Sequence, residues 1–241
     1  MKKLCSILAI CLTMTAVLAG CGSRGQGSEA VPGGQTQGSE SAVSGSQEQT
    51  RGGEDAESSQ QAEESQAAVQ EEAEQLTGLH HVKINIKDYG TLEVELDADQ
   101  APITVTNFVK LANEGFYDGL TFHRIIEGFM MQGGDPNGNG TGGSDEEIKG
   151  EFAQNGVENT LSHTRGAISM ARTSEPDSAS SQFFIMHQDG TSLDGQYACF
   201  GYVTSGMEIV DSICENAVVT DNNGTVPAEY QPVIESVEVV D

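Results

Sequence analysis

The chain has 241 residues, and its 37 Asp and Glu against 11 Lys and Arg give a formal net charge of −26. Nucleic acids and anionic membrane surfaces attract basic patches, so this charge argues against either of them as a partner. Beyond the N-terminus, no apolar stretch of the sequence is long enough to span a bilayer.

Residues 1–20 are typical of an export signal. A positively charged start precedes an apolar run from Leu4 to Leu18, which is too short for a comfortable membrane span. Small residues then lead into Cys21, and this ending resembles the lipobox of bacterial lipoproteins, in which the signal is removed before a cysteine that carries a diacylglyceryl group. We therefore predict a lipoprotein signal peptide over residues 1–20 and lipidation of Cys21, with an ordinary secretory signal as the alternative. The predicted location is the extracytoplasmic side of the cell membrane, with the lipid as the only membrane contact.

Residues 21–77 consist mainly of Gly, Ser, Gln, Glu and Ala, with almost no large apolar side chains. Such a segment cannot bury enough surface to offset its chain entropy, so we expect a disordered acidic tether. Good helix formers are concentrated from Glu54 to Gln75, but no apolar stripe gives a helix there a surface to pack on. The tether is therefore interpreted as a spacer.

A single globular domain is predicted over residues 78–241. Apolar and polar residues alternate over 82–86 and 92–96, which predicts an antiparallel hairpin with one solvent-exposed face. Pro102 suits the first turn of a helix that we expect to run to Asn113. The apolar stripe of that helix comprises Val105, Phe108, Val109 and Ala112, and Gly115 provides its stop.

The remaining pattern is mainly β. Further strands are predicted at 121–126, 129–132, 167–171, 182–186, 198–203 and 233–240, and a second helix at Met207–Cys214. Roughly eight strands and two helices suit a closed antiparallel β-barrel with its ends capped by the helices. Alternation along 121–126 predicts Phe122, Arg124 and Ile126 on one face, and an arginine among large apolar groups usually lies at the rim of a pocket.

Familiar catalytic and metal-binding patterns are not found. Residues Asp135 to Glu146 have the spacing of an EF-hand calcium loop, but a predicted strand precedes them, so an irregular surface loop is the better interpretation. The histidines lack zinc-ligand spacing, and neither a Gly-x-Ser-x-Gly elbow nor a phosphate-binding glycine loop occurs. We therefore expect neither a metal nor a cofactor. Cys199 and Cys214 are left for the folded part, and either a disulfide or two buried thiols is compatible with the sequence.

A series of motifs spans the predicted domain. They are Phe122-His123-Arg124-Ile125-Ile126, Gly128-Phe129-Met130, Gln132-Gly133-Gly134-Asp135, Gly140-Thr141-Gly142-Gly143, Ser181-Gln182-Phe183-Phe184-Ile185 and Leu193-Asp194-Gly195. In this order they resemble the cyclophilin family of peptidyl-prolyl cis-trans isomerases, over about residues 80–240. The resemblance implies an eight-stranded antiparallel barrel capped by two helices, in agreement with the pattern of predicted elements.

The resemblance also implies a site in which Arg124 is the catalytic residue. The substrate-binding positions are the pocket walls Phe129, Met130, Phe184 and Leu193, the polar groove residues Gln132 and Gln182, the strand residues Ala171 and Arg172, which bind through the backbone, and Tyr197, where many members have histidine. Three positions depart from common family residues. Ser192 replaces a tryptophan, which implies weaker cyclosporin binding, Glu127 replaces a proline at the surface, and Arg172 replaces an asparagine, which implies altered substrate preference.

These residue types suit the isomerisation of X-Pro bonds, whose rotation barrier is about 18–20 kcal/mol. Twisting the bond localises the nitrogen lone pair, and a fixed guanidinium can stabilise that state while an apolar pocket holds the proline ring. We therefore predict a monomeric isomerase that acts on proline-containing polypeptides and assists the folding of exported proteins. The alternatives are a non-catalytic binding module for proline-containing segments and, less well supported, a solute-capturing lipoprotein of a transporter, which would need two lobes.

Overall fold

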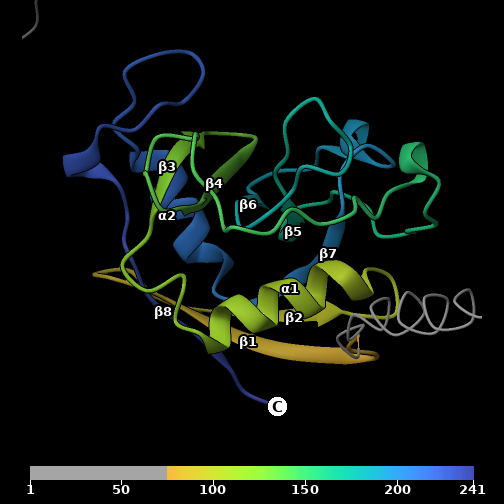
Figure 1. Cartoon of the computed structure of the whole chain (residues 1–241). Coiled ribbons are helices and arrows are strands. Elements are labelled where there is room, and N and C mark those ends of the chain that lie inside the picture. The colour runs from red at the N-terminus through yellow and green to blue at the C-terminus, as the bar shows by residue number, and fades with distance from the viewer. Residues whose placement is uncertain (1–74) are drawn as a thin grey trace, which may run out of the picture. The chain divides into compact units, whose positions relative to one another are not determined.

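The computed structural model describes residues 75–241, so the predicted signal peptide, Cys21 and nearly all of the tether lie outside the described residues. The described part contains one antiparallel sheet and two α-helices (Figure 1). Its elements are β1 (Leu79–Ile86), β2 (Gly90–Asp97), α1 (Pro102–Asn113), β3 (Thr121–Ile126), β4 (Met130–Asp135), β5 (Ala167–Met170), β6 (Phe183–Met186), β7 (Cys199–Ser205), α2 (Met207–Asn216) and β8 (Ile234–Val239). Between residues 75 and 241, no helix has the length and apolar character needed to cross a membrane.

The sheet has eight strands in the order β3-β4-β6-β5-β7-β2-β1-β8, and it is curled but open. The predicted closed barrel is therefore wrong, although the prediction of eight strands and two helices is confirmed. The edge strands β3 and β8 do not pair along a ladder, and an isolated bridge joins Thr121 to Val233, just before β8 begins. The reason is that a loop occupies the free edge of β3: Ile125 N–H donates to Gly224 O, and Val226 N–H donates to His123 O. Backbone groups already paired with this loop cannot pair with β8.

The predicted hairpin and first helix are confirmed. Val82 faces Val94 and Ile84 faces Leu92 across the β1–β2 ladder, and all four side chains are buried, as the alternating pattern requires. Helix α1 has the predicted bounds and buries its predicted stripe. Gly115 follows its C-terminus with φ 68°, a left-handed conformation that glycine adopts without steric strain.

Two apolar clusters fill the curled sheet. The larger one is centred on Phe108 of α1, whose ring centroid lies 4.9 Å from that of Tyr117 and 5.5 Å from that of Phe183. The smaller one contains Met130, Ala167, Phe184, Met186 and Cys199, and partly exposed apolar residues such as Phe129, Leu193 and Tyr197 pack against it. The larger cluster stabilises the fold, and the smaller one lies next to Arg124 in the candidate functional site.

A β-bulge in β3 corrects one further expectation. Phe122 pairs with Gly133 and Arg124 pairs with Gln132, so His123 is an extra residue between two consecutive partners. Phe122 is consequently buried in the larger cluster together with Ile125, whereas Ile126 packs against the smaller one. Regular alternation would have placed Phe122 and Arg124 on the same face. The bulge separates them, and it turns Arg124 toward the smaller cluster.

Candidate functional site

Arg124 lies at the centre of the site, partly exposed and held from two sides. Its Nε donates to the backbone oxygen of Asn223 at 2.9 Å, and its Nη1 donates to Oε1 of Gln132 at 3.2 Å. Burial lowers the pKa of the Arg124 guanidinium, while the nearby Tyr197 and Asp221 act to raise it. Because arginine stays protonated in proteins, the group remains a positive donor whose direction is set by two anchors.

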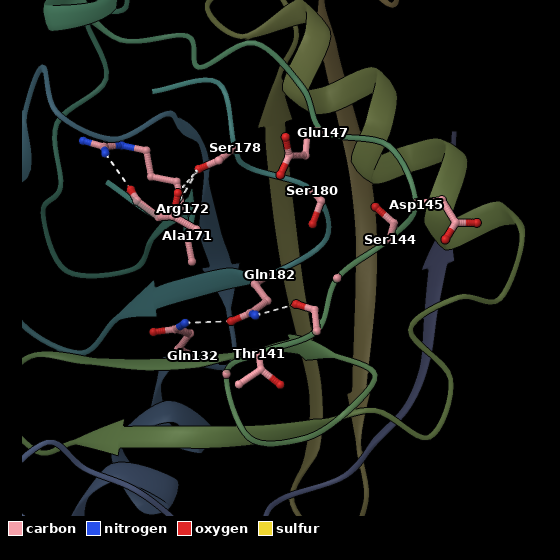
Figure 2. A pocket seen from close by; sticks show the side chains of 14 residues that line it. Gln132, Thr141, Ser144, Asp145, Glu147, Ala171, Arg172, Ser178, Ser180 and Gln182 are labelled. Carbon is pink, nitrogen blue, oxygen red and sulfur yellow. Dashed lines mark hydrogen bonds between the residues drawn. The ribbon is translucent and has the colours of Figure 1, made fainter. Parts of the chain in front are cut away.

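Two glutamines extend the anchoring of Arg124 into the neighbouring loop. Gln132 Nε2 donates to Gln182 Oε1 at 2.9 Å, and Gln182 Nε2 donates to the backbone oxygen of Gly142 at 2.7 Å (Figure 2). Each amide thus accepts at one end and donates at the other. The chain of bonds leaves the Gln132 oxygen facing Arg124, which fixes the guanidinium more firmly than a single contact would.

An apolar cavity of about 230 Å³ opens beside the guanidinium. Nine residues line it, and all nine are among the predicted site residues: Arg124, Phe129, Met130, Gln132, Ala171, Arg172, Phe184, Leu193 and Tyr197. Gln182, the tenth, lies one hydrogen bond away behind Gln132. The cavity therefore combines apolar walls with polar donors, including the guanidinium groups of Arg124 and Arg172, which suits a small apolar ring attached to a polar backbone.

Residues 171–172 were expected on a strand, but β5 ends at Met170. The N–H of Ala171 still donates to Gln182 O at 2.9 Å, which continues the sheet by one bond and places Ala171 at the cavity. Arg172 follows it and turns its side chain toward the loop that carries Tyr197. The placement of both residues at the site is as predicted, whereas the secondary structure assigned to them is not.

His163 and Asp194 support the wall that carries Leu193, and sequence reasoning did not identify His163. Asp194 Oδ1 accepts from the backbone N–H of His163 at 2.7 Å and from its Nδ1 at 2.9 Å, and the Ser169 hydroxyl lies 3.0 Å from Nε2. The imidazole also stacks on the Phe184 ring, with centroids 6.0 Å apart. No spacing motif marks His163, because Asp194, which bonds to both its backbone and its ring, lies 31 positions away in the chain.

The arrangement of Ser169, His163 and Asp194 has the order of a hydrolase triad, but it serves a structural role. Ser169 and His163 are both fully buried, so the hydroxyl cannot reach a substrate. Burial lowers the pKa of His163 despite the adjacent Asp194 carboxylate. A neutral imidazole that donates to Asp194 and accepts from Ser169 satisfies every member of the set.

Two further hollows adjoin the apolar cavity. One of about 500 Å³ lies between residues 140–147 and residues 171–182 (Figure 2), and another of about 560 Å³ lies on the far side of Arg124, beside Asn139 and Asn223. Gln132 lines all three. The three hollows therefore adjoin at Gln132.

The loop that has calcium-loop spacing is organised by its own carboxylate. Asp135 accepts backbone N–H bonds from Asn137, Asn139 and Gly140, and both of its oxygens are used. Burial raises the pKa of Asp135, but these donors outweigh it and hold the pKa below its usual range. The interpretation as an irregular loop is confirmed, since a strand and not a helix precedes it.

Cys199 and Cys214 are separate, buried thiols, so of the two alternatives left open by the sequence the disulfide is not formed. Burial raises the pKa of each thiol to about 12. Both thiols therefore stay protonated near neutral pH, and a protonated buried thiol is unreactive. Neither lines the apolar cavity.

Comparison with known proteins agrees with this geometry. Residues 81–239 match the family model described as cyclophilin type peptidyl-prolyl cis-trans isomerase/CLD. Peptidyl-prolyl cis-trans isomerase B of Bacillus subtilis is 47% identical over 136 residues, which cover 56% of this chain and 92% of the relative. Peptidyl-prolyl cis-trans isomerase A of Dickeya dadantii is 44% identical over 164 residues, which cover 63% of this chain and 80% of the relative.

Solved structures show the same fold. The crystal structure of a Cryptosporidium parvum cyclophilin type isomerase, determined in the presence of the dipeptide Ala-Pro, superposes with a TM-score of 0.59 at 32% identity. The match covers 67% of this chain and 99% of the Cryptosporidium chain. From the matched model, the identity to named isomerases and the shared structure, the chain belongs to the cyclophilin-type peptidyl-prolyl cis-trans isomerase family.

Proposed function

We propose that this protein accelerates cis–trans exchange of X-Pro bonds in exported polypeptides, with Arg124 as its catalytic residue. The observation that carries the proposal is the anchored guanidinium at the rim of an apolar cavity of about 230 Å³. A proline ring fills such a cavity without needing a hydrogen bond, which leaves its amide beside Arg124. The related structure determined in the presence of Ala-Pro supports a proline-containing substrate.

Catalysis follows from holding the ring while the preceding carbonyl rotates. In the planar amide the nitrogen lone pair is delocalised, whereas in the twisted state it is localised and becomes a hydrogen-bond acceptor. A guanidinium fixed beside that nitrogen therefore stabilises the twisted state more than either planar state. Apolar walls formed by Met130, Phe184 and Leu193 strengthen the effect, because charge–dipole attraction grows as the local dielectric falls.

The proposed place of action is the outer face of the cytoplasmic membrane. Its support is the sequence alone: an export signal over residues 1–20, a lipidation site at Cys21 and a spacer to residue 77. Partition of the expressed chain into detergent, compared with that of Cys21→Ala, tests this part independently of activity. A wild-type chain that stays in the aqueous phase would remove the anchored location from the proposal.

The activity is tested by measuring exchange in a short Ala-Pro peptide by NMR, with wild type and Arg124→Ala compared side by side. Removing a preorganised donor that acts on the transition state lowers turnover by about 10²–10³-fold, so Arg124→Ala should nearly abolish acceleration. Circular dichroism confirms that both chains are folded. A folded wild type that binds the peptide but leaves its exchange rate unchanged would establish the binding-module alternative instead.

A further inference from the structure

We propose that Arg172 is a positioning residue for the isomerase site: its guanidinium holds Tyr197, and with it the outer wall of the apolar cavity. The family resemblance assigned substrate contact to the backbone at this position and implied that the arginine alters substrate preference, without naming what its side chain contacts. The proposal rests on the proposed function, because it concerns the same cavity. Its evidence is the set of contacts made by the Arg172 side chain.

The guanidinium of Arg172 contacts two aromatic rings. Its Cζ is 4.9 Å from the centroid of Phe152 and 4.7 Å from the centroid of Tyr197. Phe152 is buried in the larger apolar cluster, with 2% of its surface exposed, whereas Tyr197 is only partly buried and lines the cavity. Arg172 therefore connects a partly exposed wall residue to the buried core through a favourable cation–π contact with each ring.

The edges of the same guanidinium are also occupied. Nε and Nη2 both donate to the backbone oxygen of Gln196, at 3.1 and 2.8 Å, and Nη1 donates to Thr173 O at 2.9 Å. The group is thus engaged by both rings and along its edges, so it is poorly placed to bind a substrate carboxylate directly. Its bonds instead secure the residue that precedes Tyr197.

The segment secured by Arg172 has no sheet partner of its own. Residues 191–197 form a short 3₁₀ turn (Thr191–Leu193) and a bend between β6 and β7, and they supply Leu193 and Tyr197 to the cavity. At its start the segment is held by Asp194 bonded to His163. At its end it is held by Arg172 on Gln196 and Tyr197. Between these two ties, the Gln154 N–H donates to Gly195 O at 2.9 Å. Tyr197 lies beyond that bond, so removing the Arg172 tie should let it move away from the cavity.

A change in the position of Tyr197 would also affect the other aromatic residues along the cavity wall. Its ring meets Phe184 edge-on with centroids 5.8 Å apart, and Phe184 stacks on His163. A continuous series of ring contacts therefore runs along the cavity wall, through Phe152, Arg172, Tyr197, Phe184 and His163. Arg124 is anchored independently, because its hydrogen bonds go to Asn223 and Gln132 and not to Arg172 or Tyr197. Loss of Arg172 should consequently weaken binding of the proline ring and leave the chemical step largely intact.

The experiment separates binding from turnover. NMR titration of a proline-containing peptide gives its dissociation constant, and exchange at saturating peptide gives the turnover rate, for wild type, Arg172→Asn and Arg172→Lys. Lysine keeps the charge but lacks the planar fork, so both variants should behave alike. We expect peptide binding about fivefold weaker and saturated exchange within about twofold of wild type, the pattern of a residue that shapes the bound state rather than the transition state.

A double-mutant cycle provides the decisive readout. If Arg172 acts through Tyr197, Arg172→Asn should weaken binding in the wild-type background but by less than about 1.5-fold in a Tyr197→Leu background. Lys149→Asn is the matched control, because it removes the same charge from an exposed side chain that does not line the cavity. It should leave binding unchanged.

Three results would overturn the proposal: unchanged binding in Arg172→Asn, full retention of binding by Arg172→Lys alone, or equal effects of Arg172→Asn in both backgrounds. The Arg172 Nε–H resonance gives a signature independent of activity, since the flanking rings should shift it upfield and Tyr197→Leu should reduce that shift. A wild type that binds the peptide without accelerating exchange would refute the proposed function, yet the binding cycle would still decide the role of Arg172.

Discussion

The sharpest test of the mechanism is Arg124→Lys, because it keeps the positive charge and removes the geometry. In the wild type, Nε donates to Asn223 O at 2.9 Å, Nη2 to Asn223 Oδ1 at 3.4 Å and Nη1 to Gln132 Oε1 at 3.2 Å, and the anchored guanidinium lines the cavity. A lysine ammonium has one nitrogen, so it cannot bond to both anchors and also face the substrate. The variant therefore tests whether catalysis needs a donor held in a fixed position or only a positive charge near the substrate.

The expected magnitude follows from what the lysine loses. A preorganised donor lost from a transition state reduces turnover by about 10²–10³-fold, equivalent to about 2.7–4 kcal/mol. Lysine keeps the positive charge but does not hold it in a fixed direction. We therefore expect the exchange rate of Arg124→Lys to be less than about a tenth of the wild-type rate. Two-dimensional exchange NMR on an Ala-Pro peptide measures the rate, with thermal melting as the control for folding.

A rate for Arg124→Lys within about threefold of wild type would refute the reasoning, since a difference below about 1 kcal/mol cannot arise from loss of a preorganised donor. In that case the charge alone would be sufficient. The anchors at Asn223 and Gln132 would then have a structural role, and the catalytic account would need a different origin of transition-state stabilisation.

Other properties of the fold give further predictions. Phe108→Ala should lower the free energy of unfolding by about 3–5 kcal/mol in denaturant titration, because the ring is fully buried among aromatic neighbours; a loss below about 1 kcal/mol would contradict the packing described for α1. Asp135 has a lowered pKa in the fold, so its ionised form stabilises the protein at neutral pH, and that stability should disappear as the pH falls through the folded-state pKa, below about 4. Asp135→Asn should therefore reduce the melting temperature at pH 7, and this reduction should become smaller as the pH falls below about 4. The thiols of Cys199 and Cys214 should react with a disulfide reagent only after unfolding, and prompt labelling of the native protein would show that they are accessible.

The local pattern of the sequence was sufficient to predict several elements of the fold and most of the residues that line the cavity. The alternation in β1 and β2, the proline and glycine that bound α1, and the apolar stripe of that helix depend on residues close together in the chain, and the structure confirms them. The motif series also identified the residues that line the cavity, since nine of the ten predicted positions do so. Because these motifs resemble those of a known family, their residues could be assigned to a common site before the fold was known.

Other features were decided by contacts between distant segments. The sheet remains open because residues 224–226 bond to the edge of β3, about 100 residues earlier in the chain, and the bulge at His123 emerges only from the pairing of β3 with β4. Neither is a property of local periodicity, which cannot show which edge a later loop will occupy.

The same reason explains the residues that support the site. His163 reaches Asp194 across 31 positions of sequence, and Arg172 reaches Gln196 across 24. In the sequence, His163 is a histidine without a motif and Arg172 is a departure from a common asparagine. The sequence alone determined which side chains line the cavity, whereas the tertiary structure decided what holds those side chains in place, because anchoring depends on which distant groups the fold brings within bonding distance.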